Sequence, residues 1–223
     1  MMWKRGKTDS LWDQICSHLD LTLSDHGIFR IFWRSWSKLP GSMYRSNQPY
    51  PFQLKKDQTN LKIKSIINLR GERDCSSYYL ENNFCKKNHI KLYNYPISSR
   101  EIPSKEKILG FFHLLDNIKY PCIMHCKSGA DRAGLAAALY LIYKNHSTVK
   151  EAKKQLTFKH LHVKYAKTGV LDHFFEYALK NNINKHKDFI DWIKKDFNKE
   201  KVNKKFNYSN MLSFLLDRVL KRE

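Results

Sequence analysis

The sequence predicts an α/β fold: a mainly parallel central sheet of about four to five strands, flanked by helices, with extra helices at the C-terminal end. Two observations support this class. Short apolar segments that suit strands alternate along the chain with longer segments of helical periodicity. The length of 223 residues is sufficient to bury one such core, whereas two independent domains would be cramped.

The elements can be placed in chain order from this alternation. The clearest pair is an apolar strand over residues 120–125, opened by Pro121, followed by a buried helix over residues 134–143 that is rich in leucine and alanine. Hydrophobic periodicity predicts the remaining elements. Strands are expected at 43–46, 64–69, 90–95 and 120–125, and helices at 51–59, 77–88, 104–117, 134–143, 148–158, 169–181, 186–197 and 209–222.

The loop between this strand and this helix contains the most informative motif. His125 and Cys126 open it, and Arg132 lies six residues after Cys126 with Gly129 between them. Such a loop can curl so that its backbone N–H groups point inward and form a cup for a phosphate group. Gly129 permits the turn because it has no side chain to clash. The residues expected to bind phosphate are Lys127, Ser128, Gly129, Ala130, Asp131 and Arg132.

Cys126 is the predicted nucleophile, because the loop amides and the Arg132 guanidinium favour its thiolate form. Arg132 would hold two phosphate oxygens in its planar fork. His125 is expected to orient the loop by hydrogen bonding and not to act as a base. This chemistry needs no metal and no other cofactor. A metal site formed by Cys122, His125 and Cys126 is disfavoured, because no second ligand pair has zinc spacing.

Residues 125–132 resemble the signature of the cysteine-based protein tyrosine and dual-specificity phosphatase superfamily. Softer similarities to a bacterial dual-specificity-like branch lie at residues 25–30, 43–49, 66–72 and 216–223, so the resemblance spans nearly the whole chain. It implies hydrolysis of phosphate monoesters through a cysteinyl-phosphate, with protein tyrosine or dual-specificity substrates as the first expectation. Phospholipids, lipid headgroups and inositol phosphates are alternative substrates. A weakly active phosphate-binding signalling module is the alternative from another class.

The sequence departs from the family pattern at two functional positions. The family usually supplies a general acid from an aspartate about thirty residues before the cysteine, and residues 96–103 contain none. Asp131 is the first candidate for this acid, because myotubularins and Sac-type phosphatases also place an aspartate inside the loop, and Glu101 is the alternative. Either carboxylate also suits a helix N-terminus without any catalytic role. Ala133 replaces the usual serine or threonine, which predicts a slower hydrolysis of the phosphoenzyme.

Several residues outside the motif are weaker candidates. Arg70 is expected to form an ion pair at the edge of the sheet, and Arg45 and Arg100 are further candidate phosphate contacts. Many relatives bring a second loop over the site after the helix of the motif. The residues that could belong to such a loop are Gln155, His160 and His162.

A single phosphatase domain is expected. Residues 1–40 would form an N-terminal extension that packs on the core, residues 41–180 the catalytic core, and residues 181–223 a C-terminal helical extension. Basic and aromatic residues alternate between Phe29 and Trp36. We expect this segment to pack its aromatic side chains onto the domain; a position at a membrane interface is the alternative.

The net charge of +20 has two interpretations. Lysine and asparagine are abundant throughout the chain, so the main interpretation is scattered, solvated lysines. The alternative is attraction to a phosphorylated protein or to lipid or small-molecule phosphates, including peripheral contact with an anionic membrane. A nucleic-acid partner is not expected, because no nucleic-acid-binding motif is present. The sequence has no export signal and no apolar run of about 20 residues, and its five cysteines are irregularly spaced. We therefore expect a cytoplasmic protein.

Overall fold

The computed structural model describes the chain except for residues 1–4, 7–9, 26, 205 and 207–223. Its centre is a five-stranded sheet with the order β1-β2-β5-β3-β4. The last four of these strands are parallel, and β1 pairs antiparallel with β2 at one edge. The predicted α/β fold with a mainly parallel sheet is therefore confirmed. The strands are β1 (Ser37–Leu39), β2 (Met43–Asn47), β3 (Ser65–Asn68), β4 (Lys91–Asn94) and β5 (Cys122–Cys126).

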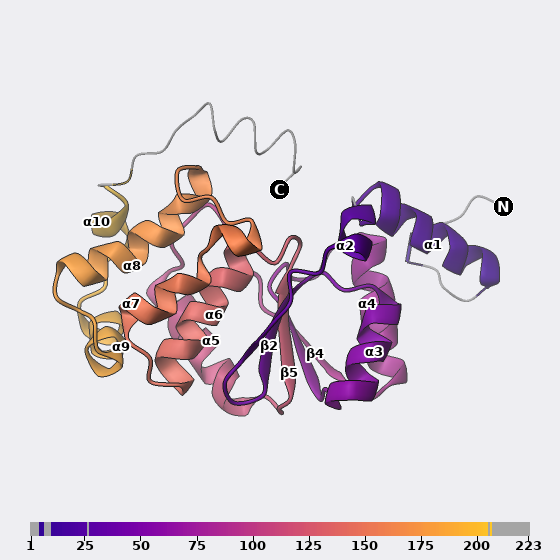
Figure 1. The fold of residues 1–223 in the computed structure, drawn as a ribbon, viewed down its shortest axis with the longest axis horizontal. Coiled ribbons are helices and arrows are strands. Elements are labelled where there is room, and N and C mark those ends of the chain that lie inside the picture. The colour runs from indigo at the N-terminus through magenta and orange to yellow at the C-terminus, as the bar shows by residue number, and fades with distance from the viewer. Residues whose placement is uncertain (1–4, 7–9, 26, 205, 207–223) are drawn as a thin grey trace.

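Helices cover both faces of the sheet (Figure 1). Side chains alternate between the two faces along each strand. Ile66 and Ile123 belong to the apolar cluster on the α3 and α4 side, whereas Ile67 and Met124 belong to the larger cluster that includes α5, α6 and α8. The helices are α1 (Leu11–Leu23), α2 (Ile28–Phe32), α3 (Pro51–Leu61), α4 (Ser76–Lys87), α5 (Lys105–Asn117), α6 (Asp131–Lys144), α7 (Val149–Ala152), α8 (Val170–Lys180), α9 (His186–Lys195) and α10 (Lys199–Asn203).

Strand β5 lies in the middle of the sheet, between β2 and β3. Its register places Cys126 beside Asn47 at the end of β2, and His125 beside Asn68 at the end of β3. Because the three strands are parallel, their carboxyl ends meet at one edge of the sheet. Ligands of open α/β sheets bind beyond this edge. The loop that follows Cys126 therefore starts at the same edge of the sheet as the segments that follow β2 and β3.

Two of the predicted helices differ from the observed ones. The helix of the motif begins at Asp131 and not at residue 134, so Arg132 lies in its first turn. The predicted helix over 148–158 ends early as α7, and a 3₁₀ turn, Lys153–Gln155, follows it. Its end has a tertiary cause, because the Gln155 carbonyl accepts a hydrogen bond from Arg45 Nη1 at 2.7 Å. The predicted helix over 209–222 lies outside the described residues.

The N-terminal extension packs on the core through polar contacts more than through its aromatic residues. Helix α1 lies along α4 and buries Ser17 and Leu21. Of the aromatic segment, Trp36 stacks on Tyr44 with ring centroids 5.4 Å apart, but Phe29 is 71% exposed. The expectation that this segment packs its aromatic side chains onto the domain is therefore wrong for most of it. Its arginines turn inward instead, toward carboxylates described below.

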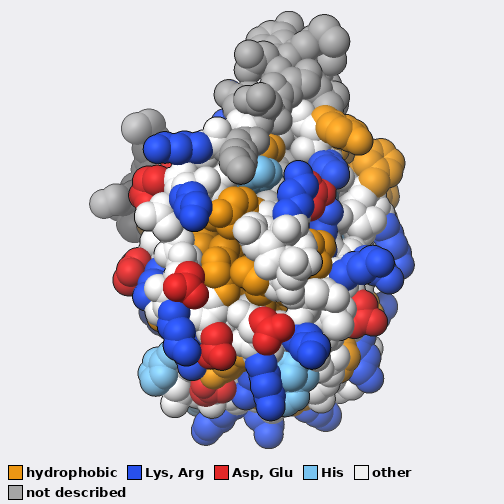
Figure 2. All heavy atoms as spheres, turned by 90° about the vertical axis from the view of Figure 1, so that its left-hand side faces the viewer, with side chains coloured by type: hydrophobic (Ala, Val, Ile, Leu, Met, Phe, Trp, Pro, Cys, Tyr) orange, Lys and Arg blue, Asp and Glu red, His pale blue; other side chains and the backbone are white. Residues whose placement is uncertain are grey.

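The C-terminal helices pack on α8 through aromatic side chains. Phe174 contacts Phe189, Trp192 and Phe197 with ring centroids 5.5 to 5.8 Å apart. Figure 2 shows this side of the molecule, where lysine and arginine are spread over the surface among acidic residues and do not gather into one patch. This distribution agrees with scattered, solvated lysines. No helix in the described part of the chain is long and apolar enough to cross a membrane.

Candidate active site

The loop from Cys126 to Arg132 connects the end of β5 to the start of α6 at the carboxyl edge of the sheet. Cys126 is the last residue of the strand and is 2% exposed. Gly129 adopts a positive φ of 75°, which glycine tolerates best. A Cβ at this position would lie 2.8 Å from the backbone nitrogen of Asn47 and 2.9 Å from Ser35 Oγ. Glycine is thus required here both by its conformation and by the space available.

A fully buried arginine holds the backbone of this loop. Arg45 Nη2 donates hydrogen bonds to the carbonyl oxygens of Gly129, at 2.5 Å, and Ala130, at 3.2 Å. In a planar peptide unit the N–H points away from the C=O. By holding these carbonyls on one side, Arg45 directs the amides that follow them toward the opposite side. Arg45 therefore shapes the loop. It is not the direct phosphate contact that the sequence had suggested.

Burial lowers the pKa of Arg45 to about 10, and the nearby Cys126 and Asp131 oppose that change. The guanidinium therefore stays charged at neutral pH. Its other nitrogen, Nη1, donates to the carbonyl and side-chain oxygens of Gln155 at 2.7 and 3.0 Å. A positive charge is thereby fixed close to the loop and to Cys126.

A carboxylate of the N-terminal extension connects the loop to the end of β3. Asp25 accepts hydrogen bonds from Arg70 at 2.9 and 3.0 Å and from Arg30 at 2.9 Å. Its Oδ1 also lies 3.6 Å from Lys127 Nζ in the loop. Burial by itself would raise the pKa of Asp25, but Arg70 and Arg30 outweigh this effect and hold the pKa well below its usual value. The expected ion pair of Arg70 is thus present, although Arg70 lies in the turn after the inner strand β3 and not at an edge strand of the sheet.

His125 is positioned beneath the loop by a buried carboxylate. Its Nε2 lies 2.8 Å from Glu81 Oε1, and both side chains are completely buried. The two groups are close enough for an ion pair but do not have hydrogen-bond geometry. Glu81 also accepts a hydrogen bond from Gln48 Nε2 at 3.1 Å. Neither ring nitrogen of His125 forms a hydrogen bond with the described residues, so its predicted role in orienting the loop by hydrogen bonding stays a prediction.

The first candidate for the general acid, Asp131, is engaged by a histidine. His162 Nδ1 lies 2.7 Å from Asp131 Oδ1, and its Nε2 lies 2.5 Å from Asp172 Oδ2. Burial would lower the pKa of His162, but the two carboxylates outweigh it and raise the pKa to about 9. His162 therefore stays protonated at neutral pH between the two carboxylates. Asp131 Oδ1 is engaged by this histidine and is not free in the loop.

The alternative acid, Glu101, lies in the segment between β4 and α5. Its side chain is 64% exposed and forms an ion pair with Lys199 at 3.0 Å. The segment that follows α7 comes to the loop instead, as expected for a second loop over the site. His160 Nδ1 lies 2.9 Å from Ser35 Oγ, which is next to Gly129. Burial lowers the pKa of His160 to about 4, with Arg45 acting in the same direction, so His160 is neutral at pH 7.

Four residues of this site were missed by sequence reasoning. Asp25 lies in a segment already noted for its resemblance, but no local signal indicates its arginine partners. The local sequence is that of an ordinary helix or polar segment around the other three residues, Glu81, Asp172 and Ser35. Each of them contacts the site only because the fold brings distant segments together.

The amino-acid pattern of the tyrosine phosphatase family matches residues 32–148, which is more than half of the chain. The chain belongs to the tyrosine phosphatase family. This family assignment covers β1 to α6 and includes the whole loop from Cys126 to Arg132. No curated protein matches the chain significantly by sequence.

Solved structures of cysteine-based phosphatases share the fold of this family member. The catalytic core of the PP-IP phosphatase Siw14 from S. cerevisiae is 26% identical, with a TM-score of 0.50, and the match covers 67% of this chain and 93% of that one. A putative phosphatase from Shewanella putrefaciens is 18% identical, with a TM-score of 0.50 over 69% of this chain and 97% of that one. TpbA from P. aeruginosa is 17% identical, with a TM-score of 0.47, and the match covers 64% of this chain and 91% of that one.

Proposed function

We propose that this protein hydrolyses phosphate monoesters through a cysteinyl-phosphate intermediate on Cys126. The observation that carries this proposal is the fixed geometry of the loop that follows Cys126. Arg45 holds the carbonyl groups of the loop, and Asp25 holds Lys127 of the loop. The backbone amides are therefore oriented before a substrate arrives. Oriented amides at the start of a helix stabilise the charge that develops on phosphate oxygens.

The reaction proceeds in two displacements. The Cys126 thiolate attacks phosphorus, the bond to the leaving oxygen breaks, and that oxygen takes a proton. Arg132 and the loop amides bind the three remaining phosphate oxygens. A water molecule then attacks the phosphoenzyme, the S–P bond breaks, and inorganic phosphate leaves with the thiolate restored. Ala133 offers no hydroxyl to stabilise this thiolate, so the second displacement is expected to limit turnover.

Phosphotyrosine is the substrate class that the surroundings of the loop favour. Glu101 is exposed and paired with Lys199, and Asp131 is paired with His162, so neither carboxylate is ready to protonate a leaving group. A phenol, with a pKa of about 10, leaves with less help from an acid than the alcohol of serine or threonine does. We therefore infer tyrosine specificity and slow reaction with phosphoserine and phosphothreonine.

An inositol phosphate is the second candidate substrate. The observation in its favour is the 26% identity to the core of a PP-IP phosphatase, Siw14, over 67% of this chain. Lysine and arginine near the loop would also suit a substrate with several phosphate groups. Phosphotyrosine and an inositol phosphate differ in the number of negative charges that the site must accept.

Phosphate release in the presence of a chelator tests the mechanism. The wild-type protein should hydrolyse an aryl phosphate, and Cys126→Ser should reduce the rate by about 10³-fold or more. Cys122→Ser is the matched control, because burial raises the pKa of Cys122 to about 12 and leaves this thiol inert. Equal activity of Cys126→Ser and wild type would contradict the proposal. A wild-type protein that binds phosphate without measurable turnover would identify a signalling module instead.

A comparison of substrates tests the specificity. Phosphotyrosine peptides should react faster than phosphoserine peptides and inositol phosphates at equal concentration. Asp131→Asn and Glu101→Gln should then be compared on aryl phosphates of increasing leaving-group pKa. A true acid would show a loss of rate that grows as the leaving group worsens. Similar small losses across the series would support a reaction that proceeds without an acid from either residue.

A further inference from the structure

The N-terminal helices expose an unusual amount of apolar side chain to solvent. We call this region the N-terminal apolar surface. On α1, the exposed residues recur at a spacing of four, which places them on one face of the helix. The surface consists of Leu11, Trp12, Ile15, Leu19 and Leu23 of α1 and Ile28, Phe29, Ile31 and Phe32 of α2, with exposed fractions between 42% and 85%.

These helices turn more apolar side chains toward solvent than an ordinary surface helix does. Helix α1 buries Leu21 in a small cluster with Leu80 of α4, but most of its other leucine and isoleucine side chains point outward. Around α2, Arg30 is buried against Asp25 and Arg34 is paired with Asp57, while Phe32 is 85% exposed. Soluble proteins rarely leave a contiguous apolar surface of this kind uncovered. Its presence indicates a partner with an apolar surface.

This surface adjoins the phosphate-binding loop. Arg30, between the exposed Phe29 and Ile31, binds Asp25, which in turn lies 3.6 Å from Lys127 of the loop. The carbonyl of Trp33, next to Phe32, accepts a hydrogen bond from Asn47 Nδ2 at 3.0 Å. In Figure 1, α1 projects from the body of the molecule beyond α4, and α2 lies between α1 and the strands. A partner bound to the apolar residues would thus lie close to the entrance of the site.

The charge of the chain decides between partners. Two copies, each carrying +20, would repel each other, so self-association through this surface is disfavoured. An anionic lipid bilayer attracts such a chain and also accepts tryptophan, phenylalanine and leucine at its interface. We propose that the N-terminal apolar surface docks on an anionic membrane and places the phosphate-binding loop at the level of the lipid headgroups. This proposal does not depend on the proposed catalytic function.

Vesicle flotation tests the docking directly. The full-length protein should float with vesicles of phosphatidylcholine and phosphatidylserine, and more weakly with phosphatidylcholine alone. Phe29→Ser with Phe32→Ser should weaken this binding by about tenfold or more, because each inserted aromatic side chain contributes to apolar burial. A blue shift of tryptophan fluorescence on addition of vesicles should accompany binding of the wild type and diminish in this double variant.

Tyr165→Ser is the matched control, because Tyr165 is also 69% exposed but lies outside α1 and α2. It should bind vesicles like the wild type, and circular dichroism should show that all variants are folded. The proposal is overturned if the wild type does not bind anionic vesicles, or if the double variant binds equally well. It is also overturned if Tyr165→Ser releases the protein to the same extent. A wild-type dimer in lipid-free solution that the double variant dissociates would identify a self-association surface instead.

Discussion

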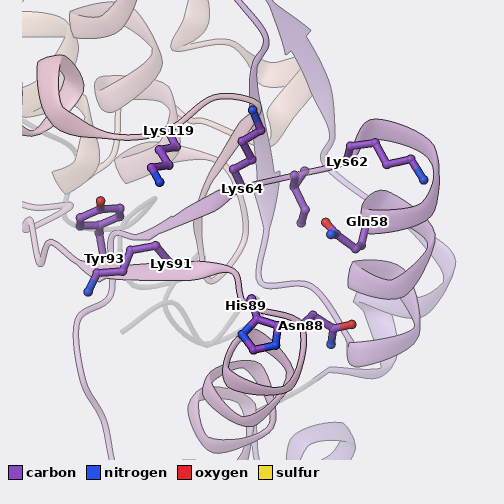
Figure 3. Close-up of a pocket in the computed structure, with 9 residues that line it drawn as sticks. Gln58, Lys62, Lys64, Asn88, His89, Lys91, Tyr93 and Lys119 are labelled. Atoms are coloured by element: carbon purple, nitrogen blue, oxygen red, sulfur yellow. The ribbon is translucent and has the colours of Figure 1, made fainter.

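The two ends of the parallel sheet both present positive charge, but buried partners hold that charge in place at the carboxyl end, where we propose that phosphate binds. At the amino end, a hollow of about 520 Å³ is bordered by the ends of α3 and α4 and by the starts of β3, β4 and β5 (Figure 3). Its lysines are exposed, and no carboxylate of the described residues pairs with them. The basic residues around this hollow are Lys62, Lys64, Lys91, Lys119 and His89.

At the carboxyl end, the positive charge is buried and fixed. Arg45 is bound to two loop carbonyls and to Gln155, and Arg70 to the carboxylate of Asp25. An exposed lysine must lose side-chain entropy and hydration to bind an anion, whereas these arginines were ordered during folding. We infer from this contrast that the proposed phosphate site depends on pre-organisation more than on the number of charges.

Replacing the arginine that holds the loop should have the largest effect. In Arg45→Lys the charge remains, but the planar fork that reaches both carbonyls is lost. We expect kcat/KM on an aryl phosphate to fall by about 100-fold, with a loss of about 2–4 kcal/mol in unfolding free energy from unsatisfied buried carbonyls. Arg34→Lys is the matched control and should cost about 1 kcal/mol or less. Unchanged activity in Arg45→Lys would refute the role of a fixed loop.

Removing the carboxylate that pairs with Arg70 should have the next largest effect. Asp25→Asn removes the carboxylate that the buried Arg30 and Arg70 share, and we expect a loss of about 3 kcal/mol at pH 7 in urea unfolding. Because the folded-state pKa of Asp25 is lowered, its contribution is present above the unfolded pKa of about 3.9 and is lost as pH falls below it. The difference from wild type should therefore shrink at pH 3. Asp116→Asn, in an exposed pair, should change stability little at either pH.

The histidine between two carboxylates should make stability depend on alkaline pH. The folded-state pKa of His162 is raised to about 9, so its contribution is complete below the unfolded value of about 6.5 and is lost as pH rises toward 9. The wild type should lose about 2–3 kcal/mol over this range relative to His162→Gln. Thermal unfolding of both proteins between pH 6 and pH 9.5 measures this. Parallel pH profiles would show that His162 is neutral in the folded protein.

The smallest effect is expected at the amino end of the sheet. Lys64→Gln with Lys91→Gln should leave aryl phosphate hydrolysis unchanged and alter stability by about 0.5 kcal/mol or less, because both side chains are exposed and form no ion pair within the described part of the chain. Steady-state kinetics and urea unfolding provide the measurement. A substantial loss of activity would show that the distant lysines contribute through the electrostatic field of the whole protein. The contrast between the two ends would then need to be revised.

Much of the fold and part of the site followed from local sequence patterns. The alternation of strand and helix predicted the α/β class because apolar periodicity directly reflects burial in each element. The loop could be predicted because its glycine and its spacing are local requirements. The early end of α7 could not be predicted, because Arg45, more than one hundred residues earlier, takes the Gln155 carbonyl. The short edge strand Ser37–Leu39 was also missed, since three residues carry too little periodicity.

Local sequence specifies the residues that can carry out the proposed chemistry: a cysteine, an arginine and a flexible turn at fixed spacing. Tertiary packing sets how those residues are held. Asp25, Glu81 and Asp172 become partners of Lys127, His125 and His162 because parallel strands deliver their carboxyl ends to one edge and the terminal helices fold over it. Local propensity acts over a few residues, whereas these contacts join positions from 10 to about 100 apart and arise only when the core has packed.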